Sequence, residues 1–177
     1  MTEGNEFILG DDHKMIRAMK ISDAPRAAEI HVFGWRSSYK GFISNEFLFN
    51  NMIVSERVRF FENAVRSNLE ETYVFDDGIV KAILTIGMCR DLDKSSSFEL
   101  WGIYIDPFMK KQGIGATMVD YCENMAIKRG CNEICLWVFE KNVEARFFYE
   151  ALGYYPDGTE KFINFLSATE IRYCKML

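Results

Sequence analysis

A strand-forming run, a turn with two glycines and a long amphipathic helix follow one another between residues 98 and 130. Residues 98–105 are rich in β-branched and aromatic side chains, and Asp106-Pro107 ends this run. From Gly113 onward, apolar side chains recur at helical spacing until Lys128-Arg129-Gly130 supplies the cations and the glycine with which helices end. This succession requires mixed α and β structure, and it places the free N–H groups of a helix beside a strand end.

The remaining chain alternates between helix and strand patterns, and we find no internal repeat. Helices are predicted at residues 24–36, 44–49, 55–69 and 142–152, and Asn142 can cap the last of them. Strands are predicted at residues 15–21, 72–75, 79–88, 133–138 and 170–176, and a further strand begins at Tyr154-Tyr155. Asp77-Gly78 and Asp157-Gly158 are typical of turns. We therefore expect a single α+β domain over residues 15–177, preceded by an N-terminal extension of residues 1–14.

The composition excludes several classes of protein. Of the 177 residues, 49% are hydrophobic and 27% are charged, which is the balance of an ordinary globular domain. No apolar run reaches the roughly 18 residues of a membrane helix, and the polar, acidic start does not resemble a secretory signal, so a cytoplasmic protein is expected. The net charge of -5 disfavours nucleic acid as a partner and is compatible with a cationic substrate such as an amine.

The cysteines predict neither a disulfide framework nor a metal centre. The chain has five cysteines, an odd number, in a sequence without a secretory signal, so free thiols are expected. Cys131 and Cys135 are too far apart for a CxxC pair, and neither histidine lies near a cysteine in the sequence. We therefore expect no metal site.

The turn at residues 110–116 (KKQGIGA) can approach a ligand closely. Gly113 and Gly115 remove side chains from the backbone, the helix N-terminus favours a phosphate group, and Lys110 and Lys111 add positive charge. The sequence does not fit a dinucleotide fingerprint, because Met118 stands where the third glycine would be, and it does not fit a P-loop. From these seven residues alone, an ordinary strand-to-helix connection remains equally open.

Two longer segments resemble the GNAT superfamily of N-acetyltransferases. IYIDPFMKKQGIGATMV is similar to the family's motif A, and LWVFEKNVEARFFYEALGY is similar to its motif B. The segment MIRAMKISDAPRAAEIHVFGWRSSYKGFISNEFL resembles the opening of the polyamine-acetylating branch and of many unassigned members. The resemblance covers roughly residues 15–177. It implies a mixed, mostly antiparallel central sheet of six to seven strands, flanked by about four helices.

The resemblance also implies a site for acetyl-CoA as cosubstrate. The strand before motif A would hold the pantetheine arm at Ile103, Tyr104 and Ile105. The turn would hold the pyrophosphate through Lys110, Lys111, Gln112, Gly113, Ile114, Gly115 and Ala116. Asn142, Arg146 and Tyr149 would contact the cofactor from one face of the motif B helix. Lys110 departs from the usual arginine or glutamine of the motif, which implies a looser phosphate contact.

Acetyl transfer to an amine requires an acid and a base. By resemblance, Tyr149 is the general acid that protonates the leaving thiolate. Glu99, at the start of the strand at residues 98–105, is the candidate base, since Trp137 occupies the family's other position for a base and cannot accept a proton. Trp35, Tyr39 and Phe42 are the candidate substrate contacts, because aromatic faces can bind a cation.

These residues lead to one main hypothesis and two alternatives. The main hypothesis is an N-acetyltransferase in which a primary amine attacks acetyl-CoA directly in a ternary complex. The resemblance slightly favours a small cationic amine such as a polyamine, and a homodimer is possible. One alternative is a catalytically idle GNAT domain that binds acyl-CoA as a sensor or as part of an assembly. The other, a covalent mechanism through cysteine, has no cysteine in either motif to support it.

Overall fold

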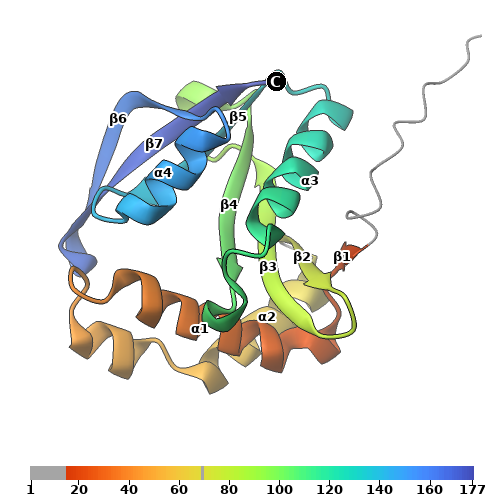
Figure 1. The fold of residues 1–177 in the computed structure, drawn as a ribbon, viewed down its shortest axis with the longest axis vertical. Coiled ribbons are helices and arrows are strands. Elements are labelled where there is room, and N and C mark those ends of the chain that lie inside the picture. Colours follow the sequence, from red (N-terminus) through yellow and green to blue (C-terminus); the bar gives the residue numbers. More distant parts are fainter. Residues whose placement is uncertain (1–14, 69) are drawn as a thin grey trace, which may run out of the picture.

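The computed structural model describes residues 15–68 and 70–177, so the predicted extension of residues 1–14 lies outside the described part. Seven strands form one sheet in the order β1-β2-β3-β4-β5-β7-β6 (Figure 1). Every neighbouring pair is antiparallel except β4 and β5, which are parallel. Mixed topology with a mostly antiparallel sheet and four main helices confirms the predicted fold class.

The elements follow the predicted order with adjusted bounds. The strands are β1 (Ile16–Ala18), β2 (Glu71–Asp76), β3 (Val80–Met88), β4 (Phe98–Ile105), β5 (Glu133–Phe139), β6 (Tyr155–Ile163) and β7 (Ala168–Met176). The main helices are α1 (Ala24–Tyr39), α2 (Val54–Ser67), α3 (Ile114–Lys128) and α4 (Val143–Ala151). Short helical turns occupy Ile21–Asp23, Phe47–Asn51, Leu92–Lys94, Pro107–Met109 and Asn164–Leu166.

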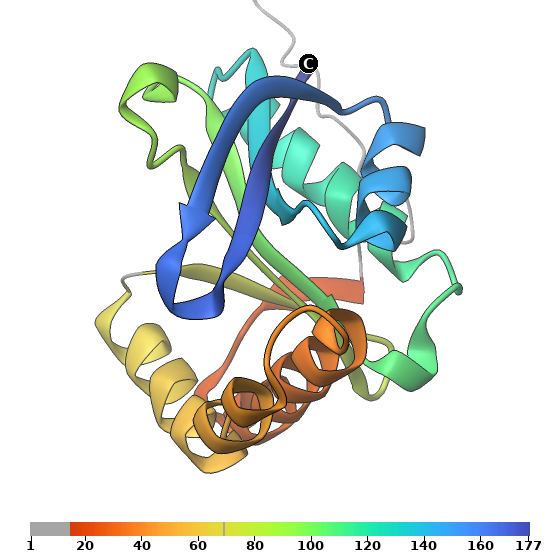
Figure 2. The same cartoon turned by 90° about the vertical axis from the view of Figure 1, so that its left-hand side faces the viewer.

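Helices cover both faces of the sheet (Figure 2). On β3, Leu84 and Ile86 pack into the core formed with α3, whereas Ile83 packs into the core formed with α1 and α2. This split follows from the alternation of side chains along a strand, and it explains why β3 is apolar at nearly every position. The two layers therefore bury β3 from both sides.

Strands β4 and β5 pair over only three residues each, Phe98–Leu100 with Ile134–Leu136. Beyond these pairs the two strands diverge, while β4 continues to pair with β3 as far as Ile105 (Figures 1 and 2). The β3–β4 register shifts between Thr85 and Ile86, which leaves Trp101 as the extra residue of a bulge. The sheet is therefore open in its middle, on the side of β4 that faces β5.

Three local predictions differ from the structure. Asp157-Gly158 does not reverse the chain but forms an irregularity within β6, where Asp157 accepts a hydrogen bond from the backbone N–H of Thr159 and binds Arg172. The reversal lies later, at Asn164–Leu166 and Ser167. Helix α1 extends beyond residue 36 to Tyr39, and the short helix predicted at residues 44–49 is a π-helix at Phe47–Asn51.

His31 on α1 is a buried histidine that burial keeps uncharged. Its side chain lies against Tyr104, Phe61 and Trp35, with 4.4 Å between the ring centres of His31 and Tyr104. Its Nδ1 has no hydrogen-bond partner within residues 15–68 and 70–177. Desolvation, and secondarily the charge of Arg57, lower the pKa of His31 to about 3.

The pKa of His31 predicts a loss of stability in mild acid. An unfolded chain binds a proton on this histidine near its usual pKa of 6.5, whereas the folded chain does so only near 3. Between these values, stability falls as pH falls, and the loss from pH 7 to pH 5 should be about 2 kcal/mol. Urea unfolding at both pH values measures it. His31→Phe should reduce the difference by that amount, and an unchanged difference would contradict the assignment.

Candidate functional site

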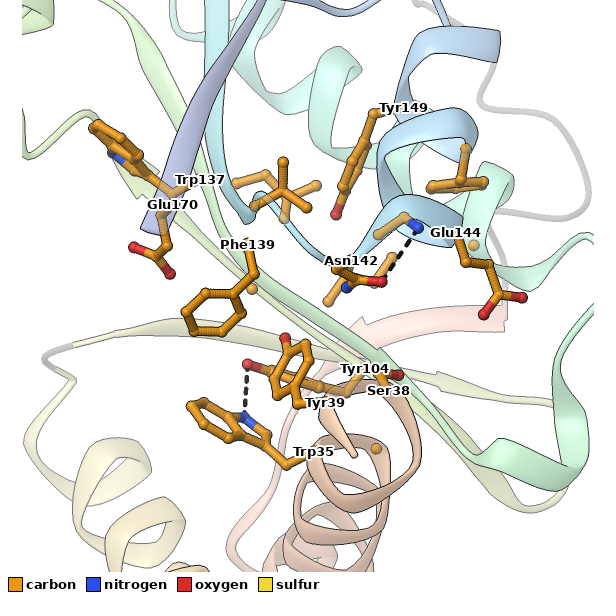
Figure 3. A pocket seen from close by; sticks show the side chains of 18 of the residues that line it. Trp35, Ser38, Tyr39, Tyr104, Trp137, Phe139, Asn142, Glu144, Tyr149 and Glu170 are labelled. Carbon is orange, nitrogen blue, oxygen red and sulfur yellow. Dashed lines mark hydrogen bonds between the residues drawn. The ribbon is translucent and has the colours of Figure 1, made fainter. Parts of the chain in front are cut away.

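A cavity of about 560 Å³ lies where β4 and β5 diverge. The C-terminal turn of α1, the N-terminal turn of α3, helix α4 and the β6–β7 connection complete its walls (Figure 3). It therefore has one end at the glycine turn before α3 and another among the aromatic residues of α1 and β5.

The glycine turn forms one wall of this cavity. Gly113 caps α3 with a φ of 82°, a left-handed conformation that favours glycine. A Cβ at Gly115 would lie 3.1 Å from both Ile105 Cδ1 and Phe148 Cζ, so any larger residue would have to push these two side chains aside. The open cavity therefore meets the N–H groups of a helix N-terminus, which suits an anion.

Most of the predicted cofactor residues of this region line the cavity. They are Ile103, Tyr104, Ile105, Lys110, Lys111, Gly113, Gly115 and Ala116. Gln112 is not among the lining residues, and Ile114 is 4% exposed and packs into the core of the α3 face. Lys110 Nζ donates a hydrogen bond to Ser38 Oγ at 3.3 Å and lies 3.8 Å from Glu144 Oε2, so it bridges α1 and α4 across the opening.

Two of the three residues predicted from motif B line the cavity. Asn142 lines the cavity and also caps α4, because its Oδ1 accepts a hydrogen bond from the backbone N–H of Ala145 at 3.4 Å (Figure 3). Arg146 is not among the lining residues: it donates hydrogen bonds to Tyr173 Oη and to the Glu140 carbonyl. The structure therefore separates Arg146 from the cavity that Asn142 and Tyr149 share.

Tyr149 projects from α4 into the cavity and is 7% exposed (Figure 3). Burial raises the pKa of Tyr149 far above its usual value, and the neighbouring Tyr104 and Cys122 add to the shift. The hydroxyl is therefore fully protonated at neutral pH, and it can donate a hydrogen bond or a proton to a group beside it.

The other end of the cavity is aromatic. Trp35 and Tyr39 lie one turn apart on α1, as predicted, and the indole N–H of Trp35 donates to Tyr104 Oη at 3.0 Å (Figure 3). Tyr39 contacts the ring of Phe139 on β5 edge-on, with 4.9 Å between ring centres. Phe42 is not among the lining residues and packs behind this pair, against Tyr39 and Phe139.

Glu99 is buried, with 1% of its surface exposed, and it is bound by Arg90. Its Oε2 accepts hydrogen bonds from the backbone N–H and the Nε of Arg90 at 2.9 and 3.1 Å, and its Oε1 accepts one from Arg90 Nη2. Arg90 lines the cavity and stacks on Trp101, whereas Glu99 is not among the lining residues. Its assignment as the base stays a prediction.

The structure adds functional candidates that the sequence did not reveal. Trp137, Phe139, Lys161 and Glu170 line the aromatic end of the cavity, and Glu170 pairs with Phe139 across β5 and β7 (Figure 3). Trp137 and Phe139 lie on β5, Lys161 lies on β6 and Glu170 lies on β7, so only the register of these three strands brings them together. A carboxylate at the start of a predicted strand was the one local signal for Glu170.

Metal binding and membrane insertion find no support in the described residues. Within residues 15–68 and 70–177, no three His, Cys, Asp or Glu side chains are grouped so that they could hold a metal ion. None of the helices in this part of the chain has the length and apolar character that crossing a membrane demands. All five cysteines are free thiols with buried side chains.

The proteins similar to this chain include two bacterial sequences and one solved structure. YuaI of Bacillus subtilis, an uncharacterised N-acetyltransferase, is 28% identical over 139 residues, or 77% of each chain. A probable N-acetyltransferase of Mycobacterium tuberculosis is 26% identical over 148 residues, covering 81% of this chain and 80% of that one. The PaiA N-acetyltransferase of Thermoplasma acidophilum, solved with coenzyme A, has a TM-score of 0.74 at 22% identity, covering 92% of this chain and 98% of that one.

The family comparison spans the glycine turn, β5 and α4 in a single match. The family described as acetyltransferase (GNAT) matches residues 43–154, which is more than half of the chain. The match contains the strand–turn–helix unit from which the cavity is built and the helix that carries Tyr149. This protein therefore belongs to the acetyltransferase (GNAT) family, whose members are acetyl-CoA-dependent acyltransferases.

Proposed function

We propose that this protein transfers the acetyl group of acetyl-CoA to a primary amine by direct attack in a ternary complex. The observation that carries the proposal is the cavity at the divergence of β4 and β5, bounded by a helix N-terminus on one side and by Tyr149 on another. The coenzyme A in the crystal structure of the similarly folded PaiA N-acetyltransferase supports the choice of cosubstrate.

Acetyl-CoA fits the chemistry of the lining residues. Its pyrophosphate is an anion, which the N–H groups at the start of α3 and the ammonium groups of Lys110 and Lys111 would hold. Its pantetheine arm carries amide groups, which can pair with the edge of β4 at Ile103 to Ile105, where β5 has moved away. The thioester would then lie beside the hydroxyl of Tyr149.

The reaction requires two proton transfers. The neutral amine nitrogen attacks the thioester carbonyl carbon, a C–N bond forms, and collapse of the tetrahedral intermediate breaks the C–S bond. The thiolate takes a proton from Tyr149, whose buried hydroxyl is a donor at neutral pH. Glu99 is the proposed base, acting through water once Arg90 releases one of the carboxylate oxygens.

A small cationic amine such as a polyamine is the favoured acceptor. Trp35, Tyr39 and Phe139 present aromatic rings at the acceptor end, and Glu170 adds a carboxylate there. Aromatic faces and a carboxylate together attract an ammonium group that approaches from solvent. The net charge of -5 acts in the same direction.

A second candidate function is acyl-CoA binding without turnover. The ion pair between Glu99 and Arg90 favours it, because both carboxylate oxygens already bind Arg90 and Glu99 does not line the cavity. The two functions share the cofactor site and differ in turnover. The effects of Tyr149→Phe and Glu99→Gln on turnover and on binding of coenzyme A distinguish the two functions.

Replacing Lys110 with alanine should weaken binding of coenzyme A about tenfold, because a charge-assisted phosphate contact is lost. Pantetheine lacks the phosphates, so its affinity should stay the same. Isothermal titration calorimetry at one ionic strength measures both. Lys128→Ala, in the last turn of α3, is the matched control. Equal weakening of pantetheine would place Lys110 away from the phosphates.

Replacing Tyr149 with phenylalanine should lower kcat on the order of 100-fold, since the leaving thiolate loses its proton donor. Affinity for acetyl-CoA should change little, because the ring remains. Free-thiol release measured with an amine panel gives the rate. Tyr154→Phe is the control: that buried tyrosine contacts the ring of Tyr149 and donates to Glu123. Similar losses in both variants would argue for a packing effect.

Replacing Glu99 with glutamine should lower kcat on the order of 100-fold while coenzyme A still binds. A glutamine keeps the size of the side chain but cannot take a proton at neutral pH. Glu133→Gln is the matched control. Glu133 lies on β5, the strand next to β4, and its carboxylate accepts hydrogen bonds from Lys94 and Ser97. If Glu99→Gln loses stability but keeps its rate, Glu99 serves only to hold Arg90.

A further inference from the structure

Lys161 places its ammonium group in the acceptor end of the cavity. Its Nζ lies 3.9 Å from the centre of the Trp137 ring and 3.0 Å from Glu170 Oε2. Lys161 on β6 stands directly opposite Glu170 on β7, so the register of the two strands sets this pair. All three side chains line the cavity. An aromatic face and a carboxylate therefore hold an alkylammonium group inside the proposed acceptor site.

The ammonium group of Lys161 can leave this position, whereas the neighbouring guanidinium group of Arg172 cannot. Arg172 faces the same indole, but its side chain is 4% exposed and binds Asp91, Asp93 and Asp157. The Lys161 side chain is 41% exposed, and it forms an ion pair with Glu170. Lysine carries a flexible chain that can turn to solvent at little cost.

The carboxylate of Glu170 requires a cation at this place. Its side chain is only 19% exposed, so a departure of Lys161 would leave a partly desolvated negative charge without its partner. An incoming ammonium group of the acceptor restores the pairing. Exchange of one alkylammonium for another leaves the charge of the site unchanged.

This ammonium site lies apart from the proposed point of acetyl transfer. Figure 3 shows Trp137 and Glu170 together at one side of the cavity and Tyr149 at another, on a different element. The nitrogen that attacks the thioester must be neutral, whereas an amine beside a carboxylate stays protonated. One molecule that satisfies both requirements carries two amino groups.

We propose that Trp137 and Glu170 form a subsite for the distal ammonium group of a diamine acceptor, and that Lys161 occupies this subsite as an internal competitor. The inference rests on the proposed amine acetylation. Lys161 then sets the affinity for acceptors with a second cation. An acceptor with one amino group and an apolar tail gains nothing from displacing it.

The test compares 1,4-diaminobutane with butylamine as acceptors. Lys161→Met removes the competing charge and keeps the length of the side chain. The ratio of kcat/KM for the diamine to kcat/KM for the monoamine should rise about tenfold, through a lower KM for the diamine. Glu170→Gln should lower the same ratio about tenfold through a higher KM. Lys81→Met, whose lysine pairs with Asp77 at the β2–β3 turn, should leave the ratio unchanged.

Three results would overturn the inference. The ratio could fall or stay the same in Lys161→Met; Glu170→Gln could lower kcat for both amines equally; or amines that carry a carboxylate could lose affinity in Lys161→Met, which would make Lys161 an anion site. If no amine is acetylated, the proposed function fails separately. Calorimetry with 1,4-diaminobutane then tests the subsite alone, and Lys161→Met must bind it more tightly than the unmodified chain.

Discussion

The early end of the pairing between β4 and β5 is the constraint on which the rest of the site depends. Three residue pairs join these parallel strands, and the strands then separate while β4 remains held by β3 and β5 by β7. Both strands are thus anchored on their outer sides, and the opening lies between them. It exposes a strand edge, a helix N-terminus and the Tyr149 hydroxyl to a single cavity.

Several charged groups in and beside this cavity are paired with one another. Glu99 binds Arg90, Lys161 binds Glu170, and Lys110 bridges Ser38 and Glu144. Each of these pairs joins a buried or half-buried group to a more exposed one. We propose that ligand binding exchanges the partners in these pairs, with a phosphate or an ammonium group of the ligand taking the place of an internal ion. Such exchange keeps the charge of the cavity balanced.

The strand–turn–helix unit could be predicted from sequence because its signals are local. Residues 98–105 form β4 as predicted, and α3 starts at Ile114 because Gly113 takes a left-handed conformation. Other features depend on contacts between distant segments. Asp157-Gly158 became an irregularity within β6 because Asp157 binds Arg172 on β7. Arg146 binds Tyr173 on β7. Glu170 lines the cavity because of the β5–β7 register, which no local sequence pattern predicts.

Amide hydrogen exchange with and without acetyl-CoA tests the position of the cofactor site most directly. We predict that added acetyl-CoA slows exchange at the β4 edge after the divergence, residues 101–105, and at the turn of residues 112–116. Exchange at β1 and β2, on the far side of the sheet, should stay the same. Slowed exchange confined to other segments, or no change at saturating acetyl-CoA, would contradict the assignment of this opening as the cofactor site.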